Sequence, residues 1–436
     1  MASGFSDLSV TFISRTLCLI MALGTQSCLA WFLGPDGRGS YAICLLFGTL
    51  LGFAFGIGCD AACVYFVSSK RFTISEGILH GFIYSGIGSC CAIITGLIIM
   101  QLPLSFLNKA TPTEFYFALG TVPFSLFSLM LLQLLTAIHQ FGWFAILSII
   151  YGLAKLSFTF ILIKIFSLGV NGALLGIFTA SIITISGSLI IFHCKSGIKF
   201  TKPSIRSLLD ILHYGIRYHA GKISNLMNFR LGTIILAFFA TRAEIGLFDV
   251  AANLATVTIM IPDALITVLI PRVAGDKIGK KDLVARCSRL TFLFCCLSLP
   301  LLAIFTRPIV AVLFSPAFLP AVLIIRLLLI GVFVRCICKV FVSYLLGTNH
   351  PGIESISVGI GITFNLLLLL ILLPIMGLTG AAIAMVAGYF ASSSVLALSF
   401  SRLSGMKFTE IWRFRASDLA LLSNPLRNAF IKVSLK

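Results

Sequence analysis

Charge is scarce in this sequence. Only 11% of the 436 residues are charged, whereas 59% are hydrophobic, and Asp and Glu together number 14. A soluble domain needs far more polar surface than this composition provides. The sequence therefore excludes soluble enzymes and soluble nucleic-acid-binding domains, although a net charge of +18 would suggest nucleic acid as a partner in a soluble chain.

Signatures of several chemistries are also missing. The thirteen Cys include no CxxC pair, the six His show no metal-ligand spacing, and no P-loop is present. Cys residues inside apolar runs behave as small hydrophobic residues. We therefore expect no disulfide, no bound metal, no cofactor and no direct use of ATP. The N-terminus also lacks the basic segment of a signal peptide, and its first apolar run is long enough to remain as a membrane span.

What the sequence has in abundance is long apolar runs, each near or above the roughly 18–20 residues that cross a bilayer. We expect an all-α polytopic membrane protein with about twelve transmembrane helices. The predicted spans are Val10–Phe32, Ser40–Phe66, Ile78–Leu102, Phe115–Ile138, Trp143–Phe166, Gly172–Phe192, Ile223–Ala240, Ile245–Ile270, Cys287–Phe305, Leu319–Leu346, Ile353–Leu373 and Gly380–Phe400.

Basic residues are distributed unequally between the two sides of this pattern. Of the 32 Lys and Arg, 21 lie on the side of the even-numbered loops and the C-terminal tail, and four lie on the other side: Arg38, Lys109, Arg242 and Arg307. Loops rich in Lys and Arg remain in the cytoplasm. We therefore expect both termini to be cytoplasmic in a multi-pass protein.

The two halves of the sequence resemble each other. Residues 168–173 (LGVNGA) match residues 376–381 (MGLTGA), Gly39 has its counterpart in Gly246, and Pro103 matches Pro308. The offsets are close to one another, which indicates duplication of a six-helix unit. An even number of spans per unit gives two six-helix bundles related by a pseudo-two-fold axis along the membrane normal.

This duplication predicts the domain organisation. We expect a six-helix bundle over residues 1–195, a basic cytoplasmic linker over 196–222, a second bundle over 223–401 and a basic tail over 402–436. Two amphipathic stretches, residues 203–213 and 412–422, are typical of helices that lie in the membrane interface.

The remaining seven bases fall inside the spans. A base near the middle of a span costs roughly 2.5–3.5 kcal/mol to insert and so tends to face a cavity or the bundle interior. Lys155, Arg230 and Arg335 lie near mid-span, and Lys339 follows Arg335 by one turn on the same face, where like charges repel. An anionic ligand would compensate these charges. Arg326 and Lys164 are expected to reach towards the interface instead.

The acids inside the spans are candidate ion-pair or coupling sites. Arg15 and Asp60 are expected at similar depths on neighbouring helices, where they could pair, with Arg15 also a candidate for substrate contact. Asp249 and Asp263 are candidate partners of Arg230 or sites for a coupling ion. The pattern leaves open whether that ion is H⁺ or Na⁺.

Two strings carry a family resemblance. LGPDGRGSYA (residues 33–42) resembles the first-loop motif of polysaccharide repeat-unit flippases in the multidrug/oligosaccharidyl-lipid/polysaccharide exporter superfamily. Gly246-Leu-Phe248, followed by IPDALITVLIPR (residues 261–272), is similar to the eighth span of that family. One departure is Gly232, where many relatives carry an acid two residues after an Arg like Arg230. That difference leaves acid-dependent ion coupling at this place in doubt.

The resemblance implies a transporter of the bacterial inner membrane rather than an enzyme. Such a protein flips undecaprenyl-pyrophosphate-linked oligosaccharides outward by alternating access, in O-antigen, capsule or exopolysaccharide pathways. Its expected partners are this lipid-linked substrate, membrane lipids and the polysaccharide assembly machinery, with no nucleic acid. Two alternatives remain open: a multidrug antiporter of the same fold, which would favour an acidic cavity, and an integral membrane polysaccharide polymerase, which would favour a larger loop.

Overall fold

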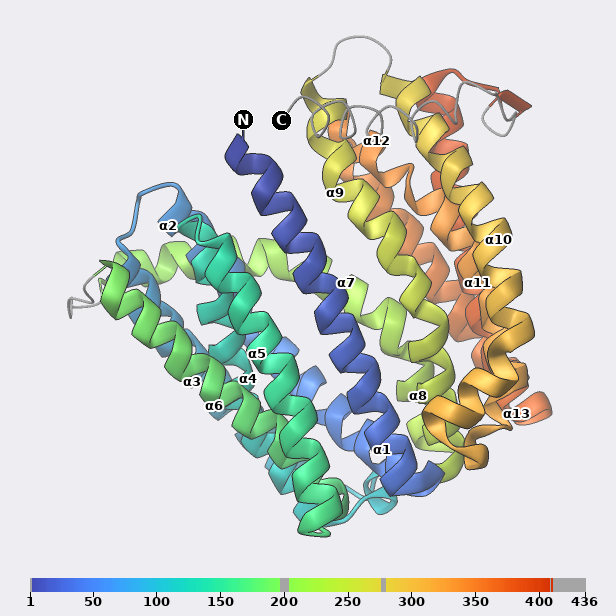
Figure 1. Cartoon of the computed structure of the whole chain (residues 1–436), viewed down its shortest axis with the longest axis horizontal. Helices are drawn as coiled ribbons and strands as arrows, with labels where there is room; N and C mark the ends of the chain where they lie inside the picture. The colour runs from blue at the N-terminus through green and yellow to red at the C-terminus, as the bar shows by residue number, and fades with distance from the viewer. Residues whose placement is uncertain (1, 197–203, 276–279, 408, 411–436) are drawn as a thin grey trace, which may run out of the picture. The chain divides into compact units, whose positions relative to one another are not determined.

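The computed structural model describes the chain except residues 1, 197–203, 276–279, 408 and 411–436 (Figure 1). Regular structure in the described residues is helical throughout, with no strand among them. The α-helices are α1 (Ala2–Gly56), α2 (Cys59–Ser68), α3 (Ile74–Ile99), α4 (Pro112–Ala137), α5 (Phe141–Phe160), α6 (Gly169–Ser196), α7 (Ile205–Phe239), α8 (Arg242–Thr256), α9 (Met260–Gly275), α10 (Lys280–Phe314), α11 (Ala321–Lys339), α12 (Val342–Gly347) and α13 (Pro351–Ser404).

Among the described residues, eight helices are long and apolar enough to cross a membrane. Two of them, Ser14–Gly56 and Gly352–Ser404, contain 43 and 53 residues. At about 1.5 Å per residue each is roughly twice as long as the ~30 Å hydrocarbon core. Each therefore holds two of the predicted spans. The expectation of an all-α polytopic membrane protein is confirmed.

The two long helices are each interrupted at one glycine. Gly34 in α1 has φ 65°, and Gly377 in α13 has φ 57°. Glycine adopts these left-handed angles without the penalty that a Cβ brings. In Figure 1, α1 descends from the N-terminus and turns back at this point. The turns fall where the sequence predicts the loops between spans one and two and between spans eleven and twelve.

The second predicted span, Ser40–Phe66, is not one continuous helix. The helix is interrupted after Gly56, because Ile57 and Gly58 have φ values of 46° and 64°. The backbone of α7 packs directly on this interruption: a Cβ built at Gly58 would lie 2.6 Å from the carbonyl oxygen of Gly215. The break between α1 and α2 is thus shaped by a helix that is distant in the sequence, which hydrophobic periodicity cannot show.

The expected linker helix is not separate from span seven. From Ile205 onwards, the region predicted as an interfacial helix forms the first part of the 35-residue helix α7. It is held against α3 and α2, since the Tyr84 hydroxyl donates to the Leu208 carbonyl at 2.5 Å and the rings of Tyr65 and Tyr214 stack at 4.5 Å. The second amphipathic stretch, residues 412–422, lies outside the described residues.

The chain divides into two compact units. The first consists of Met1–Asp249 together with Val310–Leu319, and the second of Val250–Ile309 with Pro320–Lys436. Trp31 on α1 donates its indole N–H to the Val312 carbonyl at 3.2 Å, which ties the short distant segment to the first unit. In the second unit, the rings of Phe341 and Phe400 stack at 4.5 Å inside an apolar core.

The internal repeat of the sequence has a counterpart in backbone conformation. Gly169 and Gly377, at equivalent places in LGVNGA and MGLTGA, both adopt left-handed angles, with φ 55° and 57°. In both copies a helix therefore follows a glycine that an L-residue could replace only with strain. The matched conformations agree with duplication, and the division into bundles at residues 195 and 223 remains a prediction.

Candidate functional site

The candidate site begins with a close crossing of α1 and α8 in the first unit. A Cβ built at Gly39 would overlap the carbonyl oxygen of Arg242, and one built at Gly246 would overlap the carbonyl oxygen of Pro35. Only glycine at both places allows the two backbones to approach so closely. The crossing brings Arg38, next to Gly39, against Asp249, which lies one turn after Gly246 on α8.

Arg38 and Asp249 form a buried ion pair at this crossing. The Arg38 Nη2 lies 2.6 Å from Asp249 Oδ2, and their side chains are 1% and 7% exposed. Arg38 also donates to the side-chain oxygen of Gln26, and its guanidinium stands 5.4 Å from the centre of the Tyr41 ring. Its Nε and Nη1 atoms have no hydrogen-bond partner among the described residues.

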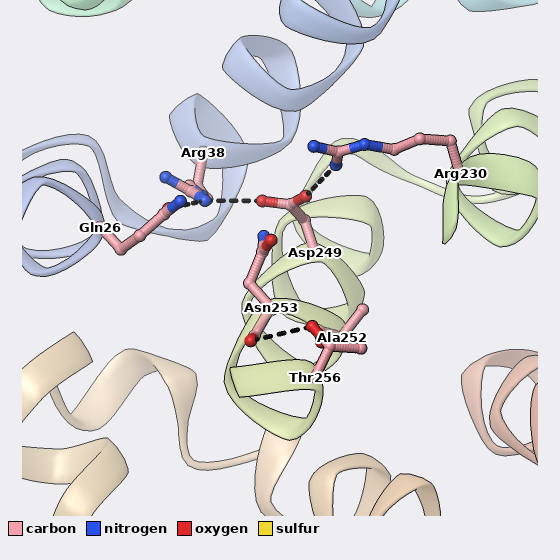
Figure 2. Close-up of polar contacts among 7 residues, drawn as sticks. All are labelled: Gln26, Arg38, Arg230, Asp249, Ala252, Asn253 and Thr256. Carbon is pink, nitrogen blue, oxygen red and sulfur yellow. Dashed lines mark hydrogen bonds and ion pairs between the residues drawn. The ribbon is translucent and has the colours of Figure 1, made fainter. Parts of the chain in front are cut away.

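Asp249 is shared with a second arginine. Arg230 on α7 places Nη1 3.5 Å from Asp249 Oδ1, and 32% of its side chain is exposed. Figure 2 shows the two guanidinium groups approaching the carboxylate from opposite sides. Two cations on one anion leave the Arg38–Asp249–Arg230 cluster with a net positive charge. A guanidinium group can donate two parallel hydrogen bonds to two oxygens of one phosphate or carboxylate. The cluster is therefore chemically suited to an anion.

The second unit holds a separate group of charges. Lys339 at the end of α11 pairs with Asp263 on α9; their side chains are 17% and 49% exposed. One turn earlier, Arg335 is 8% exposed, with its guanidinium 4.9 Å from the centre of the Tyr389 ring. An aromatic face attracts a cation, which helps to stabilise the buried Arg335. The repulsion expected between Arg335 and Lys339 is thus offset by an acid and by a ring.

The other predicted site residues lie apart from these two groups. Lys155 on α5 is half-buried and forms no ion pair with a described residue. Arg15 is exposed and forms no ion pair in the described part of the chain, so the expected pair with Asp60 is not formed. That expectation assumed two straight neighbouring helices, whereas the break at residues 57–58 sets Asp60 on the separate helix α2, where it lines a cavity.

The two bases expected near the interface behave differently from the site residues. The Lys164 ammonium lies 5.2 Å from the centre of the Phe32 ring. Exposed Arg326 donates from Nε to the Ala303 carbonyl at 3.0 Å. Neither base contacts an acid in these interactions, as expected for side chains that extend from a span towards the membrane interface.

Sequence reasoning missed Arg38, which it treated as a loop residue that reports topology. The signal that could have located it is the Gly39–Gly246 correspondence, since Asp249 lies three residues after Gly246 and Arg38 one before Gly39. Within the described residues, no group of three or more His, Cys, Asp and Glu could hold a metal ion.

Comparisons with known proteins agree with this fold. The chain matches part of the Haloferax volcanii protein described as "Probable low-salt glycan biosynthesis flippase Agl15", with 21% identity over 49% of this chain and 46% of that relative. The chain spans less than half the length of the curated relatives it matches.

Solved structures are similar over most of the chain. "Lipid II flippase MurJ, inward closed conformation" aligns with a TM-score of 0.74 and 16% identity, covering 91% of this chain and 87% of that one. A multidrug resistance MATE family transporter of the MOP superfamily, in an inward-facing conformation, aligns with a TM-score of 0.71 and 14% identity over 91% and 99% of the two chains. These likenesses show a shared fold.

The decisive comparison is with a family model. The model described as "Polysaccharide biosynthesis protein" matches residues 6–275, which include most of α1, all of α2 to α9 and the whole Arg38–Asp249–Arg230 cluster. Since this match spans more than half of the chain, the protein belongs to the polysaccharide biosynthesis protein family of membrane proteins.

Proposed function

We propose that the protein is a flippase for lipid-linked oligosaccharides. Its substrate would be an oligosaccharide repeat unit on undecaprenyl pyrophosphate, moved from the cytoplasmic to the outer leaflet of the inner membrane by alternating access. The observation that supports this most directly is the net positive Arg38–Asp249–Arg230 cluster, in which Arg230 is one-third exposed. A pyrophosphate carries the charge and the oxygen geometry that paired guanidinium groups bind.

A multidrug antiporter is the second candidate, because the fold is shared with a MATE transporter. The charge of the cluster argues against cationic drugs as substrates. Two arginines around one carboxylate repel a cation, whereas a cationic drug would require unpaired acids. The choice between an anionic substrate and a cationic drug therefore rests on the positive charge of the cluster and not on the fold.

Alternating access requires two bundles that move against each other, and we propose the predicted pair of six-helix bundles for this role. The crossing of α1 and α8 supports a pseudo-two-fold axis. Gly39 touches Arg242 while Gly246 touches Pro35, and both equivalent pairs are separated by 207 residues. Such reciprocal contacts arise where a surface meets its own copy across a two-fold axis.

The orientation is tested by cysteine labelling. In a variant without native Cys, Ser69→Cys lies in the turn after α2 and Thr113→Cys at the start of α4, and both positions are exposed. If the termini are cytoplasmic, a membrane-impermeant maleimide added to intact cells will label position 113 and leave position 69 unlabelled until the membrane is permeabilised. The reverse pattern would overturn the orientation and the direction of transport proposed here.

Substitutions of Arg230 test the substrate class. Arg230→Ala should lower the amount of exported polysaccharide at least about tenfold, which corresponds to about 1.4 kcal/mol of lost interaction with the anion. Arg230→Lys should restore export in part, because an ammonium keeps the charge but loses the fork. Arg230→Glu should abolish export. The protein should remain folded in all three, because Asp249 keeps its pairing with buried Arg38.

Surface polysaccharide measured on gels, normalised to the amount of protein in the membrane, provides the readout. Arg326→Ala is the matched control, since Arg326 is exposed and, among the described residues, its side chain has one polar partner, the Ala303 backbone carbonyl. It should leave export unchanged. Normal export by Arg230→Glu would show that the cluster serves structure alone and would remove the main support for an anionic substrate.

A further inference from the structure

An exposed lysine stands among aromatic rings at one end of the first unit. Lys164 lies just beyond the end of α5, and its ammonium is 5.2 Å from the centre of the Phe32 ring on α1. Phe160, the last residue of α5, packs edge-on against Phe32, with the ring centres 5.7 Å apart. All three side chains are exposed, as are those of the neighbouring Trp31 and Phe166. We call Lys164, Phe32 and Phe160 the Lys164 patch.

The Lys164 patch lies at the level of the membrane interface. The apolar helix Phe141–Ile165, which is long enough to cross a membrane, ends one residue after Lys164. Helix α1 turns back at Gly34, two residues after Phe32. Lysine ammonium groups and aromatic rings gather at this level of a bilayer, where their apolar parts contact lipid and their polar ends reach the headgroups. The Lys164 ammonium is therefore placed among lipid headgroups.

A stripe of exposed side chains leads from Lys164 towards the middle of the membrane. Its members recur every three or four residues and so share one face of α5: Ile146, Ile150, Leu153, Ser157 and Phe160. From Lys164 to Leu153 the chain runs eleven residues, or about 16 Å, close to the ~15 Å of hydrocarbon in one leaflet. A base thus stands at the head of a mainly apolar track as long as one leaflet is thick.

The backbone around Lys164 has an unusual conformation. Residues Ile161–Ile165 form a π-helical turn, in which the Phe166 N–H donates to the Ile161 carbonyl at 3.3 Å. Such turns are rare and occur frequently at functional sites. Within this turn Ile163 is buried, whereas Lys164 is exposed. The buried side chain anchors the turn in the unit and leaves the ammonium on the outside.

The charge of Lys164 has no acidic partner among the described residues, and its ammonium donates no hydrogen bond to any of them. Asp36, the acid closest to Phe32 in the sequence, is exposed and forms no ion pair in that part of the chain either. The Phe32 ring attracts the ammonium through its face but offers no lone pair to the N–H donors. At the membrane interface, the anion that can supply one is a lipid phosphate.

We propose that the Lys164 patch and the stripe below it bind one anionic phospholipid, such as phosphatidylglycerol. The Lys164 ammonium pairs with the phosphate, the rings of Phe32 and Phe160 pack against the glycerol region, and one acyl chain follows the stripe. Zwitterionic phospholipids bind less well, because their own ammonium competes for the phosphate. This site is separate from the Arg38–Asp249–Arg230 cluster and does not depend on the proposed transport function.

A polyprenyl phosphate would offer the same phosphate chemistry to Lys164. The stripe favours a phospholipid, because its length matches one leaflet, whereas a polyprenyl chain is much longer than one leaflet is thick. A single ammonium also lacks the fork with which a guanidinium group binds two oxygens at once. One lysine is therefore better suited to the single phosphate of a phospholipid than to a pyrophosphate.

Quenching of tryptophan fluorescence by brominated lipids tests the site. Trp143→Phe combined with Trp412→Phe leaves Trp31, next to Phe32, as the single tryptophan. The full-length protein is placed in phosphatidylcholine vesicles that contain a minor fraction of lipid with brominated acyl chains, either phosphatidylglycerol or phosphatidylcholine. We expect phosphatidylglycerol to bind about fivefold more strongly, which corresponds to the ~1 kcal/mol that one base contributes at an anionic membrane surface.

Substitutions of Lys164 show whether this preference comes from its charge. Lys164→Gln should make the two brominated lipids quench Trp31 equally. Lys164→Arg should keep the preference, because a guanidinium group retains the charge, and it guards against a loss caused by misfolding. Arg326→Gln is the matched control, since it removes an exposed base from a membrane helix of the second unit and should leave the fivefold preference unchanged.

The outcomes are distinct. A preference for phosphatidylglycerol that is lost only in Lys164→Gln supports the site. Equal quenching in the unaltered protein, or a preference that survives Lys164→Gln, overturns it. If added polyprenyl phosphate relieved the quenching at a much lower amount than unbrominated phosphatidylglycerol, the occupant would be the polyprenyl lipid and the phospholipid assignment would be wrong. The Arg230 series is independent of these results, so the lipid site and the proposed function can fail separately.

Discussion

Asp249→Ala is expected to prevent the protein from accumulating in a folded form. The substitution leaves Arg38, whose side chain is 1% exposed, without its counter-charge, and leaves Arg230 beside it. Removing one partner of a buried ion pair costs about 3–5 kcal/mol, a large share of the ~5–15 kcal/mol that stabilises a typical protein. Gel filtration of a fluorescent fusion, before and after heating, measures the loss.

A double variant makes this prediction sharper. Arg38→Met combined with Asp249→Leu replaces the pair by apolar side chains and should recover most of the stability, because a buried pair is often exchangeable for well-packed hydrophobic residues. Asp36→Ala, at an exposed acid two residues before Arg38, should be nearly neutral. A folded, heat-stable Asp249→Ala protein would show that another group compensates the charge of Arg38.

Gly246→Ala is expected to separate α8 from α1. The new Cβ would overlap the Pro35 carbonyl oxygen, and backbone cannot move aside as a flexible side chain can. Because Asp249 lies one turn further on α8, the shift also pulls it away from Arg38. Export and thermal stability should therefore fall together, and Gly39→Ala should have the same effect through the Arg242 carbonyl.

Gly120→Ala is the matched control, since a Cβ there has no neighbour within 4 Å. It lies within α4, where Ala is the better helix former by about 0.5–1 kcal/mol, so stability should be unchanged or slightly higher. If Gly246→Ala had the same melting temperature and export as Gly120→Ala, the close crossing of α1 and α8 would not be needed for stability or transport.

Hydrophobic runs were enough to predict the all-helical membrane fold, because the length and apolarity of a span are local properties of the sequence. The turn at Gly34 was equally accessible, since a Gly-Pro pair marks it. The break at residues 57–58 was harder to predict. Glycines such as Gly56 and Gly58 are common in membrane helices because they allow close packing, so their presence does not predict a break. The interruption depends on the backbone of α7, which packs against Gly58.

For the charged residues too, part of the outcome follows from the local sequence and part from helices that are distant in the sequence. That Arg230, Arg335 and Lys339 would need compensation follows from their mid-span positions. Which group compensates each one depends on the helix that lies opposite, and the sequence alone left Asp249 and Asp263 as alternatives. Arg38 was assigned to a loop because its neighbours Asp36 and Gly37 resemble loop residues, whereas its burial comes from the crossing with α8.

The segment Val310–Leu319 has a consequence for how the protein is made. It belongs to the first compact unit, although the second unit supplies the chain on either side of it. During synthesis, the first unit therefore stays incomplete until α10 has left the ribosome. Throughout that interval the Trp31 indole N–H lacks its acceptor, the Val312 carbonyl. During this interval chaperones, insertion factors and membrane proteases can bind the incomplete first unit. We expect this binding to stop only after α10 has been inserted.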